Sequence, residues 1–222
     1  MNPNFDPISL AGALALLALL PIAAILTTSF IKIAVVLMLV RNALGVQQAP
    51  PNMALYALAL ILSAYVMGPV FTDIAQQLQL AAQSSAQTGQ GMALQSLLDG
   101  LAQGIEPLKA FMLRHSDMQH RDFFMRSAHL LWGPEAAAQL KPDNLLVLVP
   151  AFLVTELTSA FKIGFLLYLP FVIIDLIVSN ILLALGMMMV SPVTISLPFK
   201  LFLFVMVDGW SRLIQGLVLS YA

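Results

Sequence analysis

Residues 144–199 read NLLVLVPAFLVTELTSAFKIGFLLYLPFVIIDLIVSNILLALGMMMVSPVTISLPF and carry only three charged side chains. About 20 apolar residues are enough for a helix to cross the hydrocarbon core of a bilayer. The stretch is therefore long enough for two spans, one over 176–199 and one over 144–174 if Glu156 and Lys162 are accepted within it. This pattern predicts a helical protein that associates with a membrane.

The rest of the chain has the same character. Residues 8–31 and 42–72 are also free of charge, and 60% of all 222 residues are hydrophobic while only 9% are charged. Soluble domains carry about 25% charged residues, so the composition is that of a membrane protein. The net charge of -1 provides no basic face for nucleic acid, and the absence of cysteine excludes disulfides and thiolate chemistry.

Between these apolar regions the composition becomes polar. Residues 76–103 are rich in Gln, Ala, Ser and Gly, and residues 105–133 place apolar side chains on one face of a helix. We therefore expect an all-α fold of membrane-associated helical hairpins with kinked or broken helices. Its predicted parts are a hydrophobic helical pair, a polar helical insertion and a second hydrophobic pair with a Met-rich loop, over 1–72, 73–143 and 144–222.

The sequence contains no pattern typical of an enzyme. His115, His120 and His129 are not spaced by four residues, and no acidic cluster accompanies them. The nucleophile-elbow, phosphate-loop and dinucleotide-binding motifs are all missing from the sequence. We expect no catalytic residue, no metal site and no cofactor.

Seven charged residues stand singly inside or beside the apolar runs: Lys32, Arg41, Glu156, Lys162, Asp175, Lys200 and Asp208. A charge at the centre of a lipid-facing helix costs about 2.5–3.5 kcal/mol, so such side chains normally face protein or water. Lys32 and Arg41 can also reach water from the ends of spans, whereas the short side chain of Asp175 cannot.

The spacing of these charges suggests partners for some of them. Asp208 and Arg212 are four residues apart, where one helix brings two side chains together, and we predict a local ion pair. The six other charges are four bases and two acids, so they cannot all be paired among themselves. Pro170 is expected to kink or end the helix before Asp175. Our hypothesis is that Asp175 and Lys200 pair between subunits.

A run of three methionines lies between a glycine and a proline, in Gly186-Met187-Met188-Met189-Val190-Ser191-Pro192. Gly and Pro interrupt a helix, and such a break at membrane depth requires surrounding protein or a cavity. On a loop, three Met side chains can form a soft apolar collar, which a ring of subunits could use to seal a pore. The alternative is that the methionines merely fill an irregular core.

Several motifs together resemble one family. They are Thr28-Ser29-Phe30-Ile31-Lys32, Arg41-Asn42-Ala43-Leu44-Gly45, Pro50-Pro51-Asn52, Pro150-Ala151-Phe152, Phe161-Lys162-Ile163-Gly164-Phe165, Pro198-Phe199-Lys200 and Asp208-Gly209-Trp210. In this order they resemble the FliP/SctR family, export-apparatus proteins of flagella and type III secretion injectisomes. The similarity covers the whole chain and is weakest between Asp73 and Asp143. Asn42 and Lys162 resemble the virulence injectisome branch more than the flagellar one.

The resemblance implies an export gate without enzymatic activity, through which unfolded proteins cross the bacterial inner membrane. It implies a homo-oligomer, a pentameric ring, that assembles with subunits of the FliQ/SctS and FliR/SctT types. Export proteins of the FlhB/SctU and FlhA/SctV types and the inner rod would be further partners. The assembly would extend into the periplasm, which the polar insertion would face.

The resemblance also suggests roles for single residues. It assigns Met187, Met188 and Met189 to a gasket around the closed pore. It places contacts between subunits at charged residues of the matching motifs, namely Asp175, Lys200, Arg41, Glu156 and Lys162.

Two other functions stay open. One is a small-solute or proton-conducting membrane transporter, with Asp175 and Glu156 as relay carboxylates. The chain shows no inverted repeat of broken helices, the usual pattern of transporters. The other is a structural scaffold without a pore.

Overall fold

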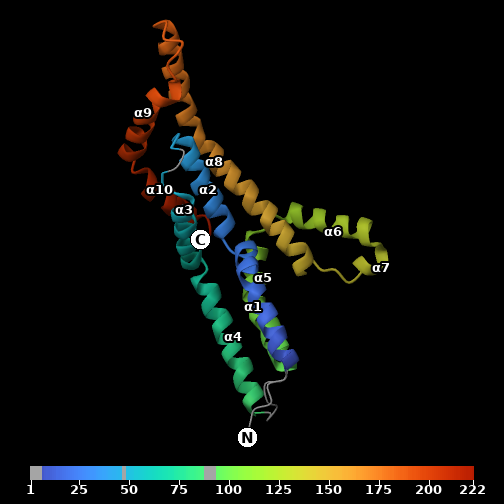
Figure 1. The fold of residues 1–222 in the computed structure, drawn as a ribbon. Coiled ribbons are helices and arrows are strands. Elements are labelled where there is room, and N and C mark those ends of the chain that lie inside the picture. The colour runs from blue at the N-terminus through green and yellow to red at the C-terminus, as the bar shows by residue number, and fades with distance from the viewer. Residues whose placement is uncertain (1–6, 47–48, 88–93) are drawn as a thin grey trace. The chain divides into compact units, whose positions relative to one another are not determined.

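The computed structural model describes residues 7–46, 49–87 and 94–222, and every regular element in these residues is a helix (Figure 1). The helices are α1 (Pro7–Thr27), α2 (Phe30–Ala43), α3 (Asn52–Val66), α4 (Gly68–Gln87), α5 (Leu94–His115), α6 (Met118–Trp132), α7 (Pro134–Ala137), α8 (Leu145–Ala184), α9 (Pro192–Met206) and α10 (Gly209–Leu219). The prediction of an all-α fold with broken helices is confirmed.

The charge-free runs of the N-terminal half are not single helices. In the first run, α1 ends at Thr27, where the Thr27 hydroxyl donates a hydrogen bond to the carbonyl of Ala23 at 2.7 Å. In the second run, α3 ends at Val66 and α4 begins at Gly68. Ser and Thr hydroxyls that bond one turn back compete with the backbone, and glycine and proline weaken a helix, so these breaks lie where the sequence favours them.

α8 is the longest helix, with 40 residues. Among the described residues it is the one helix that is long and apolar enough by itself to cross a membrane, with a mean hydropathy of 2.3. Three further stretches are long and apolar enough to cross a membrane when two consecutive helical segments count as one bent span: Pro21–Thr27 with α2, α3 with Gly68–Leu80, and α9 with α10. Broken helices at membrane depth require neighbouring protein to satisfy their free backbone groups.

Pro170 was expected to kink or end the helix before Asp175, and it does not end it. α8 continues from Leu145 to Ala184 and passes through both Pro150 and Pro170. A proline removes one backbone hydrogen bond and crowds the carbonyl four residues before it. The apolar sequence on both sides of Pro170 continues as helix, so α8 is not interrupted.

The described residues form two compact units. Unit 1 contains residues from Met1–Ser29 and Met67–Glu156, and unit 2 contains those from Phe30–Val66 and Leu157–Ala222. The predicted three-part division along the sequence describes composition, whereas each unit in space draws on two separate parts of the chain. That division stays a prediction.

Unit 1 is built around α5. α4 packs against α5, and a Cβ at Gly104 would lie 3.4 Å from Cδ2 of Leu78. The Phe111 ring of α5 meets the Phe152 ring of α8 edge-on, with 5.9 Å between centroids. Met112 and Phe152 are fully buried. Apolar contacts on one face of α5 therefore hold unit 1 together.

The start of α6 is fixed by a local cap and by α8. The Asp117 carboxylate accepts a hydrogen bond from the backbone N–H of Gln119 at 2.9 Å, as a helix N-cap does. The Thr155 hydroxyl donates to the carbonyl of Ala151, and its oxygen lies 3.0 Å from the Asp117 N–H and 2.9 Å from His120 Nδ1. Because that single hydroxyl proton is used by Ala151, the Thr155 oxygen accepts from both other groups.

A surface ion pair joins α5 to the turn before α8. Lys109 Nζ lies 2.8 Å from Glu106 Oε1 and 3.7 Å from Asp143 Oδ2. The hydrogen bond from Lys109 to Glu106 raises the pKa of Lys109 above its ordinary value, although partial burial acts in the opposite direction. All three side chains reach solvent, so this network is an exposed one.

Unit 2 packs α2 at its centre. Ile33, Val36 and Leu37 of α2 are fully buried. α8 approaches α2 closely at Gly164, where a Cβ would lie 2.3 Å from Cδ1 of Leu39. Small residues allow apolar helices to approach in this way when no water is available to drive their association.

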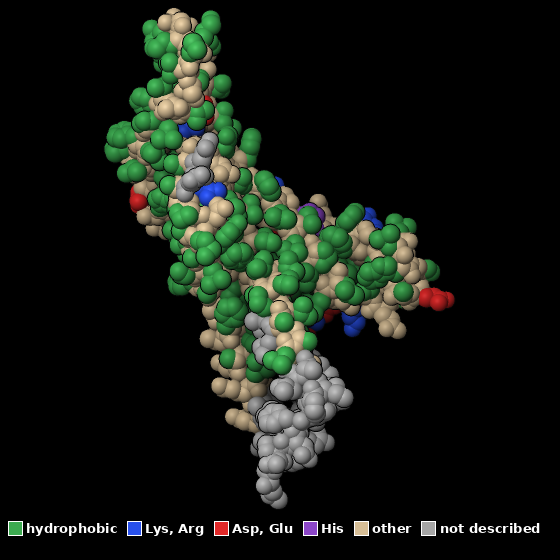
Figure 2. Space-filling view, in the orientation of Figure 1, with side chains coloured by type: hydrophobic (Ala, Val, Ile, Leu, Met, Phe, Trp, Pro, Cys, Tyr) green, Lys and Arg blue, Asp and Glu red, His purple; other side chains and the backbone are tan. Residues whose placement is uncertain are grey.

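The surface of the single chain is itself rich in apolar side chains. Figure 2 shows hydrophobic side chains over most of the visible face. On α8 alone, Phe161, Phe165, Leu166 and Ile173 are exposed. Apolar surface of this extent requires lipid or other protein chains to cover it.

Candidate functional site

The methionine run forms the loop that joins α8 to α9. Gly186, with φ at 73°, ends α8 in the left-handed region that favours glycine. The N–H of Gly186 donates to the carbonyl of Leu183 at 3.0 Å, and the N–H of Met187 donates to the carbonyl of Leu182 at 2.9 Å. These two hydrogen bonds together form a Schellman motif, which turns the chain sharply at a helix end. At the other end of the loop, Pro192 begins α9 at the position where its fixed φ suits a helix start.

The methionine side chains of this loop lie outside the core of the chain. Met187 is 42% exposed, Met188 is 81% exposed and Met189 is completely exposed. The alternative in which these methionines fill a core within their own chain is therefore wrong for the described structure. Whether they form a gasket stays a prediction.

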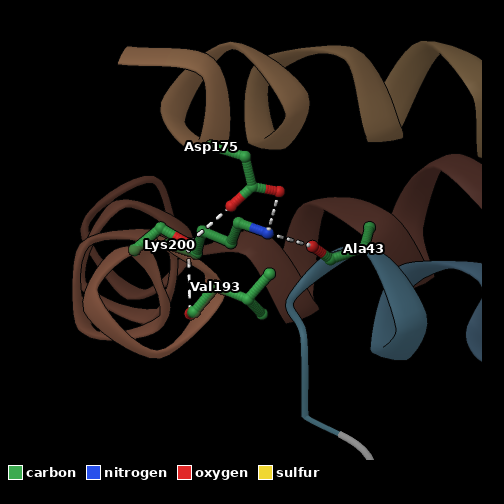
Figure 3. Close-up of polar contacts among 5 residues, drawn as sticks. Ala43, Asp175, Val193 and Lys200 are labelled. Carbon is green, nitrogen blue, oxygen red and sulfur yellow. Dashed lines mark hydrogen bonds and ion pairs between the residues drawn. The ribbon is translucent and has the colours of Figure 1, made fainter. Parts of the chain in front are cut away.

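An ion pair joins the two helices below this loop. Lys200 Nζ of α9 lies 2.6 Å from Asp175 Oδ2 of α8, and the Ser196 hydroxyl donates to Asp175 Oδ1 (Figure 3). The Lys200 side chain is 4% exposed and that of Asp175 is 30% exposed. Ser196 and Lys200 are four residues apart on α9, so both face the same carboxylate. The ion pair and the Ser196 hydrogen bond thus join α8 to α9 at the base of the hairpin that carries the methionine loop.

Lys200 also connects this hairpin to α2. Its Nζ donates a second hydrogen bond to the carbonyl of Ala43, the last residue of α2, at 3.3 Å (Figure 3). The carbonyls at a helix C-terminus have no partner within the helix and carry a partial negative charge. An ammonium group at this place therefore stabilises both the helix end and the nearby Asp175 carboxylate.

The structure forms the Asp175–Lys200 pair within one chain, whereas the sequence led us to expect it between subunits. A pair inside the chain already satisfies both charges. The assignment of these two residues to contacts between subunits stays a prediction, which a single chain does not test.

The other charges predicted as contacts lie in different surroundings. Arg41 donates through Nη1 to the side chain of Asn52 and, at 3.4 Å, to the carbonyl of Pro50, while its buried Nε has no partner in the described residues. Lys162 is exposed on α8. Glu156 belongs to unit 1 and is 2% exposed. Within this set, the structure places Asp175 and Lys200 in one ion pair.

The predicted ion pair between Asp208 and Arg212 is not formed. Asp208 lies before α10 and has φ at 53°, in the left-handed region, so the helical spacing of four residues does not apply to its side chain. Its carboxylate accepts a hydrogen bond from the Ser211 hydroxyl at 2.9 Å instead. Only the backbone N–H of Arg212 bonds to Asp208, through the carbonyl oxygen at 3.1 Å.

Sequence reasoning missed two partners of charged side chains. Ser196, which bonds Asp175, could have been found because it lies one helical turn before Lys200. Tyr221, whose ring centroid lies 3.6 Å from Lys32 Nζ, gave no signal because it is far from Lys32 in the sequence. Cations above aromatic faces gain electrostatic stabilisation, especially when water is excluded.

The described part of the chain has no group of three or more His, Asp or Glu side chains placed to hold a metal ion.

Comparison with known proteins assigns the chain to a family. The sequence pattern of the FliP family matches residues 13–217. The chain belongs to the FliP family. The resemblance predicted from the sequence motifs is confirmed.

Named relatives extend this assignment. The chain is 54% identical to "Yop proteins translocation protein R" of Yersinia pestis over 216 residues, which cover 97% of each chain. It is 51% identical to "Hypersensitivity response secretion protein HrcR" of Ralstonia nicotianae, over 98% of this chain and 99% of the relative. It is 44% identical to "Virulence protein YscR" of Salmonella typhimurium, over 98% of each. These names describe translocation, secretion and virulence, in agreement with the expected injectisome branch and with a protein that is not an enzyme.

Proposed function

We propose that this protein is a core subunit of the export gate of a type III secretion system. Copies of the chain form the pore through which unfolded proteins cross the bacterial inner membrane, and the loop of Met187, Met188 and Met189 seals this pore when no substrate is present. The observation that carries the proposal is the exposure of these three methionines on a loop with fixed ends. Membership of the FliP family and the names of the relatives support the role in secretion.

The exposure of the loop supports a partner outside the single chain. Full burial of a Met side chain stabilises a protein by about 1.5–3 kcal/mol, so three exposed methionines represent a large unused apolar contribution. Met is unbranched and deformable, and a collar of Met side chains from several copies would fit an irregular closed opening. The same side chains would move aside for a passing polypeptide at small cost, because they have many rotamers of similar energy.

The anchoring of the loop supports a seal that stays in place. The Schellman motif at Gly186 fixes where the loop leaves α8, and the Asp175–Lys200–Ser196 contacts hold α8 and α9 together below it. Figure 1 shows these two helices ending in the loop at one tip of unit 2. A soft tip on a rigid base suits a gasket, which must deform without losing its position.

The apolar surface supports assembly with other chains. Further copies or other subunits that cover the exposed apolar side chains of α8 would remove this surface from water. Arg41, Glu156, Lys162, Asp175 and Lys200 are the charged residues that we assign to contacts between subunits. The partners would be four further copies in a pentameric ring, the FliQ/SctS and FliR/SctT types of subunit, the FlhB/SctU and FlhA/SctV types, and the inner rod. The ring would extend from the inner membrane into the periplasm.

The gasket is tested by replacing Met187, Met188 and Met189 together by Ala in the complete secretion system. We expect ions to leak across the membrane while the chain still folds with an unchanged unfolding temperature as a single subunit, because exposed side chains contribute little to the stability of one chain. Ion flux into cells or proteoliposomes and secretion of substrate are the measurements. The matched control replaces three other exposed methionines, Met53, Met118 and Met206, by Ala.

The outcomes separate the competing functions. Unchanged ion flux and unchanged secretion in the triple variant would contradict the gasket. Loss of uptake of a small solute without any leak would favour a transporter. The same leak in the control variant would show that exposed methionines act generally and not through this loop.

A further inference from the structure

Unit 2 contains an apolar cavity of about 480 Å³ between α8, α9 and α10. Its walls include Leu167, Phe171, Phe204, Leu213 and Leu217. Four of these five side chains are buried core residues, so the cavity reaches the interior of unit 2. Its volume lies within the range of about 300–1,000 Å³ that is typical of sites for small ligands.

One charged side chain borders this cavity. Among the described residues that line it, all are apolar or glycine except Arg212 of α10. The guanidinium group of Arg212 forms no hydrogen bond or ion pair with another described residue, because Asp208 lies outside the helix and bonds Ser211 instead. A guanidinium group offers five N–H donors in a planar arrangement that matches a phosphate.

We propose that this cavity binds an anionic phospholipid, with one acyl chain between α8, α9 and α10 and the phosphate against Arg212. The apolar walls suit the chain, and the unpaired positive charge at their edge suits the negative headgroup. Lipid can reach the cavity because α8, which forms part of its wall, is long and apolar enough to cross a membrane. This inference does not depend on the role of the methionine loop.

The depth of the cavity favours a lipid over a second copy of this chain. Its walls include the buried side chains of Val40 and Leu217, and a thin flexible acyl chain reaches such a depth without displacing them. A second copy that brought only an apolar helix face would leave the Arg212 charge without a counter-charge. An anionic lipid satisfies both parts of the site with one molecule.

Two glycines of α10 allow the site to be altered selectively. A Cβ at Gly216 would meet no atom within 4 Å, so a larger side chain there extends into free space beside the cavity. A Cβ at Gly209 would instead lie 2.4 Å from the Phe204 ring. Gly216→Leu therefore adds an apolar side chain at the cavity wall without a clash, whereas Gly209 must be left intact.

The experiment uses the fluorescence of Trp210, whose ring centroid lies 5.3 Å from that of Phe204 in the cavity wall. Trp132 is the only other tryptophan and is replaced by Phe. The full chain is reconstituted in phosphatidylcholine vesicles, and phosphatidylglycerol with brominated acyl chains, which quench tryptophan, is added in increasing fractions. Brominated phosphatidylcholine in unbrominated vesicles is the parallel series.

We expect phosphatidylglycerol to quench Trp210 at a lower mole fraction than phosphatidylcholine does. Arg212→Gln should reduce this preference about fivefold, as expected for one basic residue beside an anionic lipid. Gly216→Leu should remove the saturable quenching by either lipid. The matched controls are Arg114→Gln, an exposed arginine of unit 1, and Gln215→Leu, an exposed neighbour of Gly216 that does not line the cavity.

Three results would overturn the proposal. The first is equal quenching by both lipids in proportion to their mole fractions, and the second is an unchanged preference in Arg212→Gln. The third is a Gly216→Leu protein that loses its oligomers in native mass spectrometry while its lipid preference stays the same, which would assign the cavity to a second copy. If Gly216→Leu does not fold, the surface variant Arg212→Gln decides alone.

Discussion

Two lysines of this chain each bond a carboxylate at nearly the same distance, but in very different surroundings. In unit 1, Lys109 meets Glu106 at 2.8 Å, with side chains that are 20% and 61% exposed. In unit 2, Lys200 meets Asp175 at 2.6 Å, with side chains that are 4% and 30% exposed. Water surrounds much of the first pair, whereas in the second pair it reaches Asp175 but hardly reaches Lys200. Geometry alone therefore does not decide how much an ion pair matters; burial does.

The consequence is a difference in what each pair does. The exposed pair adds a small contribution to a unit that apolar contacts already hold together. The buried pair closes the base of the hairpin that carries the methionine loop, and its loss would leave a charge without a partner in an apolar region.

Removing the carboxylate should lower the free energy of unfolding much more for the buried pair than for the exposed pair. Asp175→Ala leaves the buried Lys200 ammonium uncompensated, and we expect the free energy of unfolding to fall by about 3 kcal/mol, the lower end for buried pairs because Asp175 is partly exposed. Glu106→Ala should cost no more than about 1 kcal/mol. Denaturant unfolding of the purified protein in detergent, followed by circular dichroism, is the measurement. Equal losses in both variants would contradict the comparison.

A double variant tests the same pair further. Asp175→Leu with Lys200→Met removes both charges and keeps apolar volume, so it should recover most of the stability that Asp175→Ala loses. No recovery would indicate that Lys200 matters mainly through its bond to the α2 carbonyl of Ala43.

Helix packing offers a second comparison, between Gly164 in unit 2 and Gly104 in unit 1. Alanine at Gly164 would place its Cβ 2.3 Å from the Leu39 side chain, and we expect a loss of about 1–3 kcal/mol from the forced displacement. Alanine at Gly104 would lie 3.4 Å from the end of the Leu78 side chain, which can shift, so helix propensity should offset most of the crowding. Thermal unfolding of the two single variants is the check. A larger loss at Gly104 would refute the close approach of α8 to α2.

A third effect is confined to unit 1. Asp117→Ala removes the N-cap of α6 and should lower stability by about 1 kcal/mol. Asp122→Ala, an exposed aspartate within the same helix, is the control and should change stability by less than about 0.5 kcal/mol. Hydrogen exchange of the first turn of α6 should increase only in the Asp117 variant; an equal increase in both would exclude capping as the cause.

The smallest effect concerns pH. Because the pKa of Lys109 is raised in the folded protein, its contribution is complete below the pKa of the unfolded chain and is lost as the pH rises through the higher folded value. Stability that depends on Lys109 should therefore be constant near neutral pH and decrease above the ordinary lysine value of 10.5. Comparing unfolding of the protein and of Lys109→Met from pH 7 to 11 measures this. A difference that grows as the pH falls from 9 to 7 would contradict the direction of the shift.

The sequence was sufficient for the features that depend on neighbouring residues. Long apolar runs predicted the helices, and Gly186 and Pro192 predicted the loop between α8 and α9, because both residues act on their own backbone. The family motifs, read in order, predicted membership of the FliP family. Each of these signals lies within a short stretch of the chain.

The features that failed or were missed depend on the folded structure. Pro170 does not end α8, since the apolar helix on both sides outweighs one lost hydrogen bond. Asp208 and Arg212 do not pair, because a left-handed residue breaks the helical spacing. The bond of Lys200 to the carbonyl of Ala43 joins residues far apart in the sequence, and no local pattern indicates it.

The most direct test of the account concerns where the methionine loop lies in the assembled protein. The chain has no cysteine, so Met188→Cys introduces a single thiol, and Met53→Cys, at an equally exposed position on α3, provides the control. We predict that in the assembled complex a short bifunctional thiol reagent cross-links copies through residue 188 and not through residue 53. A residue 188 that reacts freely without any cross-link, as residue 53 does, would contradict a methionine seal at the centre of a ring.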